Sequence, residues 1–297
     1  MATRDIAIFD VIETRFPGLV AAVREIIRES ERAYEGDGGG KDSFLWEHTM
    51  HVASIAEQLA RSENIDPLVP VVAALFHDAG KFAGGRYHEE GTIEEEESAH
   101  IAEPLLRQFG MKASDMNRTL AGLRALYNEN LRKNRIAAII HDADFLSKFG
   151  AMGVASFFIK STLRGRTLRI SVLEYLSKEL TYAACLPLNM RTDSGRKLAN
   201  RKAADSMRFF RSLLAELKSA RIADLRIRSL RIPSASSRNK FLSIRLAVSP
   251  TCLDCGEDWE MAWATEDGVK CHKLSVDWSC PHCGKRLETS FCLPEIA

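Results

Sequence analysis

The chain has 297 residues, of which 45% are hydrophobic and 27% are charged, and this composition excludes collagen-like, fibrous and largely disordered proteins. Its 41 Lys and Arg residues against 40 Asp and Glu residues leave a formal charge of +1. That charge is too small for the whole surface to bind nucleic acid or an anionic membrane, so any such binding must be local.

The amino terminus shows no targeting or membrane-spanning pattern. Charged residues interrupt the first 16 positions, so the uncharged apolar core of a signal peptide is missing. The longest apolar run, residues 68–76, is shorter than the roughly 18 residues that span a bilayer. We therefore expect a cytoplasmic protein with no membrane partner.

Helical periodicity extends from Phe9 to about Leu217, interrupted by glycine-marked turns. In one segment His48 shares a stripe with apolar residues at steps of four, three and four, namely Val52, Ile55 and Leu59. This pattern predicts that His48 points into the core. His51 lies near the edge of the stripe, which favours a surface or supporting position over metal ligation.

A basic segment follows the last predicted helical turns. Residues 191–245 contain 15 Lys and Arg residues but 4 Asp and Glu residues. A solvated helix face is the ordinary interpretation, and contact with phosphate or nucleic acid is the alternative. Residues 231–238 are polar and contain a proline, which predicts a linker. From Ile244 to Val248 apolar residues alternate, which predicts a strand.

Two histidines and several aspartates form the first group with chemical meaning. His48 is followed by the doublet His77-Asp78 and then by Asp142 and Asp144. Imidazole with carboxylate suits a divalent ion of intermediate softness such as Mn, Fe, Co, Ni or Zn. Adjacent helical residues diverge by about 100°, so both members of the doublet reach one ion only where the helix frays or the ion lies between them.

These residues resemble the HD-domain metal-dependent phosphohydrolases, whose pattern is a His, a His-Asp doublet and a distant Asp. The segment from Leu75 to Lys81 looks like the family's common form of the doublet. Residues 142–154 and 190–201 resemble a subgroup of small bacterial members, so the similarity covers roughly residues 40–217. The resemblance implies an all-α helical bundle with His48, His77, Asp78 and Asp144 as metal ligands, and it leaves open whether Asp142 is a further ligand or supports the site from outside.

The resemblance also implies a reaction. Water activated by the metal would hydrolyse a phosphomonoester or phosphoanhydride of a nucleotide-like molecule. Asp78 and Lys81 are the predicted catalytic residues. The predicted substrate-binding residues are Lys81, Arg196, Lys197 and Arg201. The flanking His88 and His100 could hold a second metal ion or simply be solvated.

The cysteines are concentrated at the other end of the chain. Cys252 and Cys255 form one CxxC pair, Cys280 and Cys283 form another, and a glycine follows each pair. Two such pairs can hold one structural zinc ion in a tetrahedral four-cysteine site, as in zinc ribbons. Cys271 and Cys292 are left over, as buried small residues, substitute ligands or a redox pair.

We therefore predict an all-α HD phosphohydrolase domain over residues 1–220, a basic linker and entering strand over 221–250, and a small β-rich zinc ribbon over 251–297. The alternative is a non-catalytic adaptor that senses a nucleotide through the helical domain. Such an adaptor would bind nucleic acid, or a protein partner, through the ribbon and the basic segment.

Overall fold

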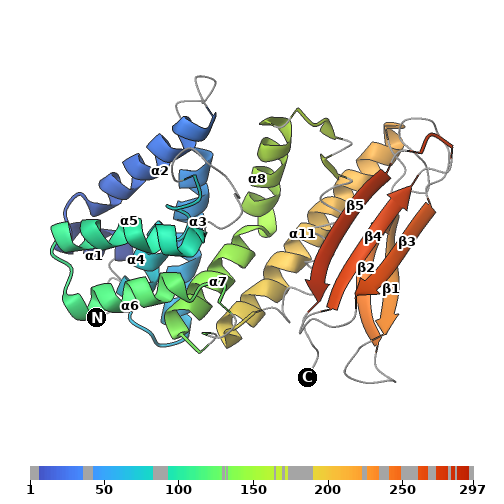
Figure 1. Cartoon of the computed structure of the whole chain (residues 1–297). Coiled ribbons are helices and arrows are strands. Elements are labelled where there is room, and N and C mark those ends of the chain that lie inside the picture. Colours follow the sequence, from blue (N-terminus) through green and yellow to red (C-terminus); the bar gives the residue numbers. More distant parts are fainter. Residues whose placement is uncertain are drawn as a thin grey trace, which may run out of the picture. The chain divides into compact units, whose positions relative to one another are not determined.

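The computed structural model describes residues 7–35, 43–82, 93–128, 131, 133–163, 165–168, 171–172, 190–222, 226–233, 241–248, 260–266, 272–279, 282–284 and 286–293. The predicted helical region is confirmed through Ser219 (Figure 1). Its helices are α1 (Ile8–Arg15), α2 (Leu19–Glu35), α3 (Phe44–Ser62), α4 (Leu68–Phe76), α5 (Glu94–Gln108), α6 (Ala113–Arg124), α7 (Arg135–Ser147), α8 (Gly150–Leu163) and α11 (Asp193–Ser219).

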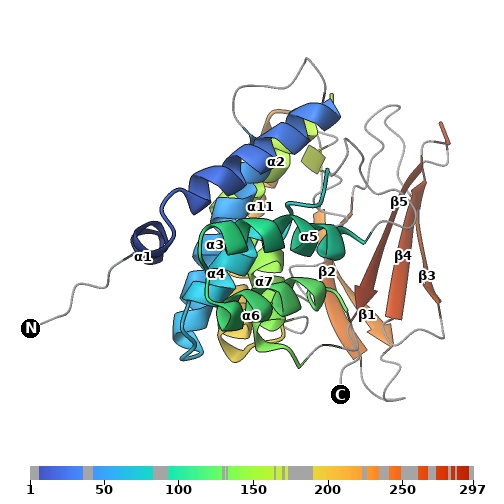
Figure 2. The same cartoon turned by 60° about the vertical axis from the view of Figure 1, so that its left-hand side comes forward.

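The chain divides into two compact units. The first comprises residues 1–147 together with 191–195, and the second comprises 148–190 and 196–297. In the first unit α3 packs against both α4 and α7, and α5 packs against α6 (Figure 2). None of the helices in the described ranges is long and apolar enough to cross a membrane.

The core of the first unit is built around α4 and α7. All nine residues of α4 are buried, in keeping with its apolar sequence LVPVVAALF. Helix α7 is also buried on nearly every side, although it carries His141, Asp142 and Asp144. Since buried polar groups need partners, the contacts of these three residues are informative about function.

Helix α3 begins at a buried carboxylate from α2. Glu31 accepts hydrogen bonds from the backbone N–H of Leu45 (3.0 Å) and from the Ser43 hydroxyl, and Ser43 in turn accepts one from the N–H of Trp46 (3.0 Å). These contacts satisfy N–H groups that have no partner within the helix. They hold the start of α3 one turn before His48.

A carboxylate also lies at the start of helix α11. Glu63, at the end of α3, accepts a hydrogen bond from the N–H of Ser194 (2.8 Å). Hydrogen bonds from the side chain and backbone of Ser194 hold the pKa of Glu63 below its ordinary value. A negative charge here also favours the positive end of the helix dipole.

We expect Glu63→Gln to lower the free energy of unfolding by about 0.3–1 kcal/mol at pH 7. Because the folded-state pKa of Glu63 is depressed, its contribution is present above the unfolded-state pKa near 4.5 and is lost as the pH falls through the folded-state value. Chemical denaturation at pH 7 and below pH 4 should therefore show a difference at the higher pH that shrinks at the lower. Glu57→Gln, which removes only the exposed pair with Arg61, is the control.

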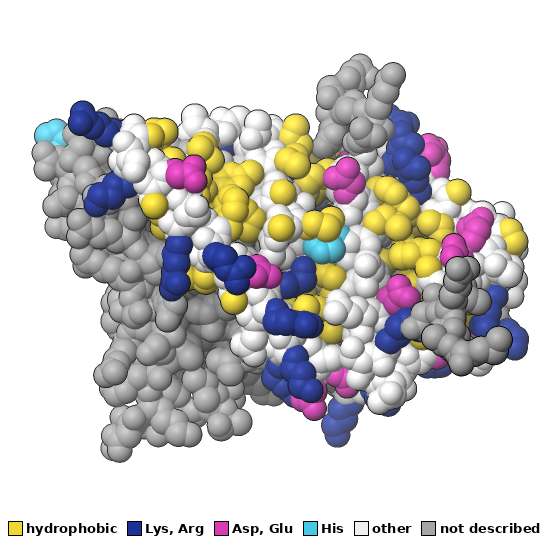
Figure 3. Space-filling view, turned by 180° about the vertical axis from the view of Figure 1, so that it is seen from behind, with side chains coloured by type: hydrophobic (Ala, Val, Ile, Leu, Met, Phe, Trp, Pro, Cys, Tyr) yellow, Lys and Arg dark blue, Asp and Glu magenta, His cyan; other side chains and the backbone are white. Residues whose placement is uncertain are grey.

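In the second unit α8 contacts α11 through a buried hydrogen bond and through aromatic rings. The N–H of Gly150 donates to the Ser206 hydroxyl (2.9 Å), and the Phe158 ring lies 6.3 Å from that of Phe210. The apolar side chains of Phe210, Leu214 and Leu217 on α11 are buried. Basic residues of α11 such as Arg201 and Arg208 are exposed. Figure 3 shows Lys and Arg side chains interspersed with hydrophobic and acidic ones on one face.

The rest of the described chain forms two antiparallel sheets. Strands β1 (Arg226–Pro233) and β2 (Phe241–Val248) pair as a hairpin, so the strand predicted at 244–248 is confirmed. The predicted linker at 231–238 is wrong for its first three residues, because they pair along β2 and end β1. The second sheet has the order β3 (Glu260–Glu266), β4 (His272–Ser279) and β5 (Arg286–Leu293).

Candidate metal centre

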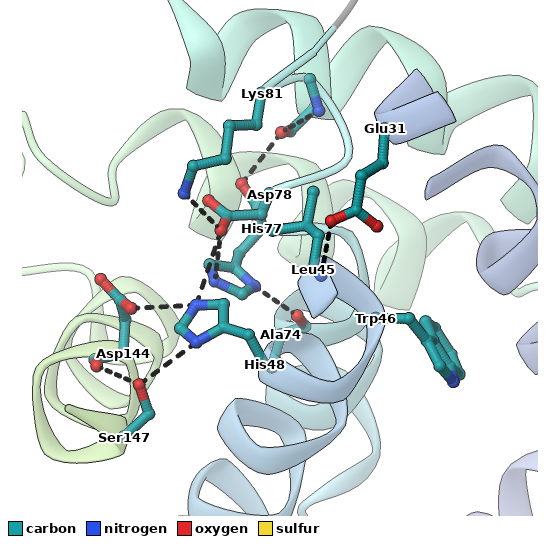
Figure 4. A network of polar contacts seen from close by, with 12 residues as sticks. Glu31, Leu45, Trp46, His48, Ala74, His77, Asp78, Lys81, Asp144 and Ser147 are labelled. Atoms are coloured by element: carbon teal, nitrogen blue, oxygen red, sulfur yellow. Dashed lines mark hydrogen bonds and ion pairs between the residues drawn. The ribbon is translucent and has the colours of Figure 1, made fainter. Parts of the chain in front are cut away.

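The predicted stripe on α3 is present. Val52, Ile55 and Leu59 are buried, and the His48 side chain on the same face is 15% exposed. Helix α4 ends at Phe76, so His77 and Asp78 lie in the turn that follows. Both side chains face His48 (Figure 4). One ligand atom from each of these three residues lies within 4.8 Å of the others.

The protonation of the His77 ring follows from its hydrogen bond. Its Nδ1 lies 2.7 Å from the carbonyl oxygen of Ala74, which can only accept, so Nδ1 carries the hydrogen. In the neutral ring Nε2 then holds a bare lone pair. This atom is buried without a hydrogen-bond partner among the described residues, and it lies 3.6 Å from Oδ2 of Asp78. Two lone pairs that face each other in a buried site are unfavourable unless a cation lies between them.

In His48 too, the hydrogen bond of the ring places the hydrogen on Nδ1. The Ser147 hydroxyl donates to the carbonyl of Asp144 (2.7 Å), so its oxygen is left to accept from Nδ1 of His48 (3.4 Å). Nε2 of His48 then points at two carboxylates, 3.5 Å from Oδ2 of Asp78 and 3.3 Å from Oδ1 of Asp144. Burial lowers the pKa of His48, which favours the neutral ring. Metal-binding histidines are commonly fixed by such a contact through the other ring nitrogen.

Asp78 is a carboxylate in this setting. Burial raises the pKa of Asp78, but the surrounding His77, Lys81 and His48 together lower it more, so the pKa lies below its ordinary value. Nζ of Lys81 donates to Oδ2 of Asp78 at 2.7 Å. The site thus contains two imidazoles, from His48 and His77, and two carboxylates, from Asp78 and Asp144. This set of donors fits a divalent transition metal.

The doublet turn is held from the other side by α5. The Ser98 hydroxyl donates to the carbonyl of His77 (2.9 Å) and accepts from the N–H of Gly80 (3.0 Å). A Cβ atom at Gly80 would lie 2.6 Å from the carbonyl oxygen of Glu94, so only glycine fits this approach. Sequence reasoning gave Ser98 no role, because its contacts with His77 and Gly80 depend on how α5 packs beside the doublet turn.

Asp142 is placed differently from Asp144. Its Oδ1 accepts from the N–H of Arg191 (2.8 Å) and lies 3.0 Å from Nδ1 of His141, while its Oδ2 accepts from the N–H (2.8 Å) and the hydroxyl (2.7 Å) of Thr192. These contacts use both oxygens of a fully buried carboxylate. Asp142 therefore anchors the start of α11. The structure does not bring it close to His48, His77, Asp78 and Asp144, which together form the group around His48.

Tyr127 is a neighbour of the group that sequence reasoning missed. It follows α6 in a turn, and its hydroxyl donates to Oδ2 of Asp144 at 2.5 Å. Although 44% of the surface of Tyr127 is exposed, its hydroxyl lies in a buried position beside Asp144. This burial and the negative charge of Asp144 raise the pKa of the hydroxyl well above the ordinary value. No spacing in the sequence connects a turn at 127 with an aspartate 17 residues later.

Other predicted site residues lie elsewhere or outside the described residues. Arg196, Lys197 and Arg201 are exposed residues of the second unit, and the Arg196 guanidinium donates to the carbonyl of Met190 (3.0 Å). His100 is exposed on α5, and His51 is intermediate in exposure. Cys283 is exposed in a turn and precedes Gly284. Outside the described residues are His88, Cys185, Cys252, Cys255, Cys271 and Cys280.

Comparisons with known proteins show which folds and families the chain resembles. The chain has no match among curated proteins. Among solved structures, Bacillus subtilis YpgQ has a TM-score of 0.50 at 20% identity, over 68% of this chain and 94% of that one. A predicted HD superfamily hydrolase from an uncultured Thermotogales bacterium has a TM-score of 0.49 at 22% identity, over 71% and 99%. YpgQ in complex with ADP has a TM-score of 0.47 at 23% identity, over 67% and 96%.

The likeness to YpgQ at 20% identity shows a shared fold. Residues 45–144 match the family described as HD domain, and this range begins in α3 and ends at Asp144. It therefore contains the doublet turn and every member of the group around His48. The chain is thus similar to HD domains across the whole of the candidate metal centre.

Proposed function

We propose that this chain is a metal-dependent phosphohydrolase that acts on a phosphomonoester or phosphoanhydride of a nucleotide-like substrate. His48, His77, Asp78 and Asp144 would hold the divalent cation. The observation that carries the proposal is the buried Nε2 of His77, which accepts no hydrogen bond in the described part of the chain and faces the Asp78 carboxylate. The tautomers of both histidines leave Nε2 open toward the Asp78 carboxylate.

The chemistry of the donors limits the metal. Nitrogen with carboxylate oxygen suits Mn, Fe, Co, Ni or Zn better than Mg. When bound, such an ion lowers the pKa of a water molecule toward about 7 and so supplies hydroxide near neutral pH. The chain's own residues orient the donors: the Ala74 carbonyl and Ser147 fix the two rings, and Ser98 fixes the doublet turn.

Lys81 supplies positive charge at the same place. Its ammonium contacts Asp78 and is partly exposed, so it can also approach a phosphate oxygen bound at the group around His48. Phosphoryl transfer depends largely on positioning and on charge placed near the phosphate oxygens. Arg196, Lys197 and Arg201 remain predicted phosphate contacts from the sequence.

For Lys81→Met we expect kcat/KM to fall about 100-fold, as for loss of one preorganised charge, with no fall in Mn²⁺ affinity. Steady-state kinetics and a Mn²⁺ titration give the two values. Lys112→Met, an exposed residue before α6, is the matched control. Unchanged kcat/KM in Lys81→Met would leave Lys81 as a partner of Asp78 alone.

The test of the proposed function is turnover of a panel of nucleoside monophosphates, triphosphates, cyclic nucleotides and linear oligonucleotides by the full chain. Mn²⁺, Co²⁺, Ni²⁺ and Mg²⁺ are each added to protein freed of metal. Release of phosphate or pyrophosphate that requires added metal supports the proposal and narrows the substrate. Metal binding without turnover on any substrate would favour the nucleotide-sensing or nucleic-acid-binding adaptor.

We also propose a structural zinc ion held by Cys252, Cys255, Cys280 and Cys283. The spacing of the two CxxC pairs supports it. A second support is Gly284, which follows Cys283 with a φ of +69°, a conformation that glycine adopts without strain and that lets the chain turn sharply after the cysteine.

Metal analysis of purified protein tests the zinc proposal. Cys283→Ser is expected to lose about one zinc ion per chain, since a four-cysteine site needs every ligand. Cys185→Ser, outside the two pairs, should keep it. Equal zinc content in the two variants would argue against the four-cysteine site.

A further inference from the structure

The two oxygens of Asp144 have different surroundings. Oδ1 lies 3.3 Å from Nε2 of His48, on the side of the proposed metal, whereas Oδ2 accepts the Tyr127 hydroxyl hydrogen bond. A free carboxylate can bind a cation through one oxygen or both. A strong donor on Oδ2 leaves Oδ1 as the oxygen that faces His48.

Tyr127 is itself held by the segment that precedes α11. The Arg191 guanidinium donates to the carbonyl of Leu126, the residue before Tyr127, at 2.8 Å. The backbone N–H of Arg191 donates to Asp142. Asp142 and Asp144 are two residues apart on α7, so the contacts lead from Asp142 through Arg191 and Leu126 to Tyr127, and from Tyr127 back to Asp144.

The Tyr127 ring has a second support. Its centroid lies 6.0 Å from that of His141, at an interplanar angle of 59°, and Nδ1 of His141 contacts Asp142. The hydroxyl therefore reaches Asp144 from a ring and a backbone that are both tied to the Asp142 anchor. All of these residues belong to the first unit.

We propose that Tyr127 is a positioning residue for the metal ligand Asp144, and that Arg191 sets the position of Tyr127. The inference rests on the proposed function, because it assumes that Asp144 binds the cation. Partners that orient metal ligands typically change metal affinity 10- to 100-fold when they are removed. Loss of the hydroxyl frees Oδ2, so the ligand can rotate or bind through both oxygens.

The experiment titrates the full chain with Mn²⁺, which binds thiolate sites poorly. The electron paramagnetic resonance signal of free Mn²⁺ gives Kd, and the line shape of bound Mn²⁺ reports the symmetry of its ligands. Tyr127→Phe keeps the ring and removes the hydroxyl, whereas Tyr127→Leu removes both. Arg191→Met keeps the backbone bond to Asp142 and removes the guanidinium. Arg118→Met, an exposed residue of α6, is the control.

We expect Tyr127→Phe to weaken Mn²⁺ binding by about 10- to 100-fold and to change the bound signal, with an unchanged melting temperature without metal. Arg191→Met should shift Kd in the same direction, and Arg118→Met should match the wild type. A Tyr127→Phe protein with the wild-type Kd and line shape overturns the inference but not the proposed function. If Tyr127→Phe does not fold, an unchanged Kd in Arg191→Met overturns it. Wild-type protein that binds no Mn²⁺ overturns the proposed function and this inference together.

Discussion

Replacing Asp78 by Asn is expected to reduce metal-dependent phosphate release by at least about 100- to 1,000-fold. Asp78 is the point where the site converges, because Oδ2 lies within 3.6 Å of Nε2 of both histidines and 2.7 Å from Nζ of Lys81. An amide keeps the shape of the side chain but removes the charge that a cation needs. Initial rates with the best substrate of the panel, at saturating Mn²⁺, give the comparison.

The matched control is Asp115→Asn, which removes a carboxylate of α6 whose partner is the exposed Arg118. It should keep wild-type rates. Melting curves of both variants without added metal show whether each is folded. A folded Asp78→Asn protein with wild-type turnover would contradict the assignment of the group around His48 as the active site.

The position of the doublet could be predicted from local sequence. The apolar run before His77 predicts a buried helix, and the need for both His77 and Asp78 to reach one ion predicts either that the helix frays at the doublet or that the ion lies between the two side chains. In the structure α4 ends at Phe76, immediately before it. The stripe of Val52, Ile55 and Leu59 on α3 likewise predicts the inward direction of His48, since helical periodicity is a local property.

Contacts between distant segments could not be predicted in this way. Tyr127 reaches Asp144, Arg191 reaches Leu126, and Ser98 spans the doublet turn, but no pattern in the sequence pairs these residues with one another. Each contact depends on how separate helices pack in three dimensions. A single sequence fixes the faces of the helices much better than it fixes which polar groups meet between them.

The basic carboxy-terminal region shows a different limit. Alternation of apolar residues identifies β2. In Arg226–Pro233, Arg and Ser are interleaved with the apolar residues and the segment ends in a proline. Only its pairing with β2 shows that this segment is a strand. Proline is compatible with a strand at an edge or an end, and Pro233 is the last residue of β1. Polar composition with a proline therefore does not distinguish a linker from a short strand.

The second large effect separates the two aspartates of α7, of which the sequence left the role of Asp142 open. For Asp142→Asn we expect the free energy of unfolding to fall by several kcal/mol. The NH₂ group of an asparagine would replace one of the two carboxylate oxygens. It would then face either the donor of Thr192, or those of Arg191 and His141, and each donor left without an acceptor costs about 1–3 kcal/mol. Space at this anchor is also tight, because a Cβ atom at Gly195 would lie 2.3 Å from Oδ2 of Asp142.

Asp144→Asn should have the opposite signature. Without metal the amide carbonyl can still accept from Tyr127, and its NH₂ group can donate to Nε2 of His48, a new hydrogen bond worth about 1 kcal/mol. The metal-free protein is therefore expected to be at least as stable as the wild type, while its Mn²⁺ binding is lost. Chemical denaturation without Mn²⁺ and Mn²⁺ titration of both variants provide the two measurements.

These opposite signatures follow from what each carboxylate faces. The oxygens of Asp142 are surrounded by donors and stabilise the fold without metal, whereas Oδ1 of Asp144 faces a lone pair, which the proposed cation would neutralise. If the Asp142→Asn protein were as stable as the wild type but unable to bind Mn²⁺, Asp142 would be a metal ligand. That result would contradict its role as an anchor for the start of α11. A ligand that destabilises the metal-free fold is the expected consequence of a site arranged for a cation, because its donors must face one another before the ion arrives.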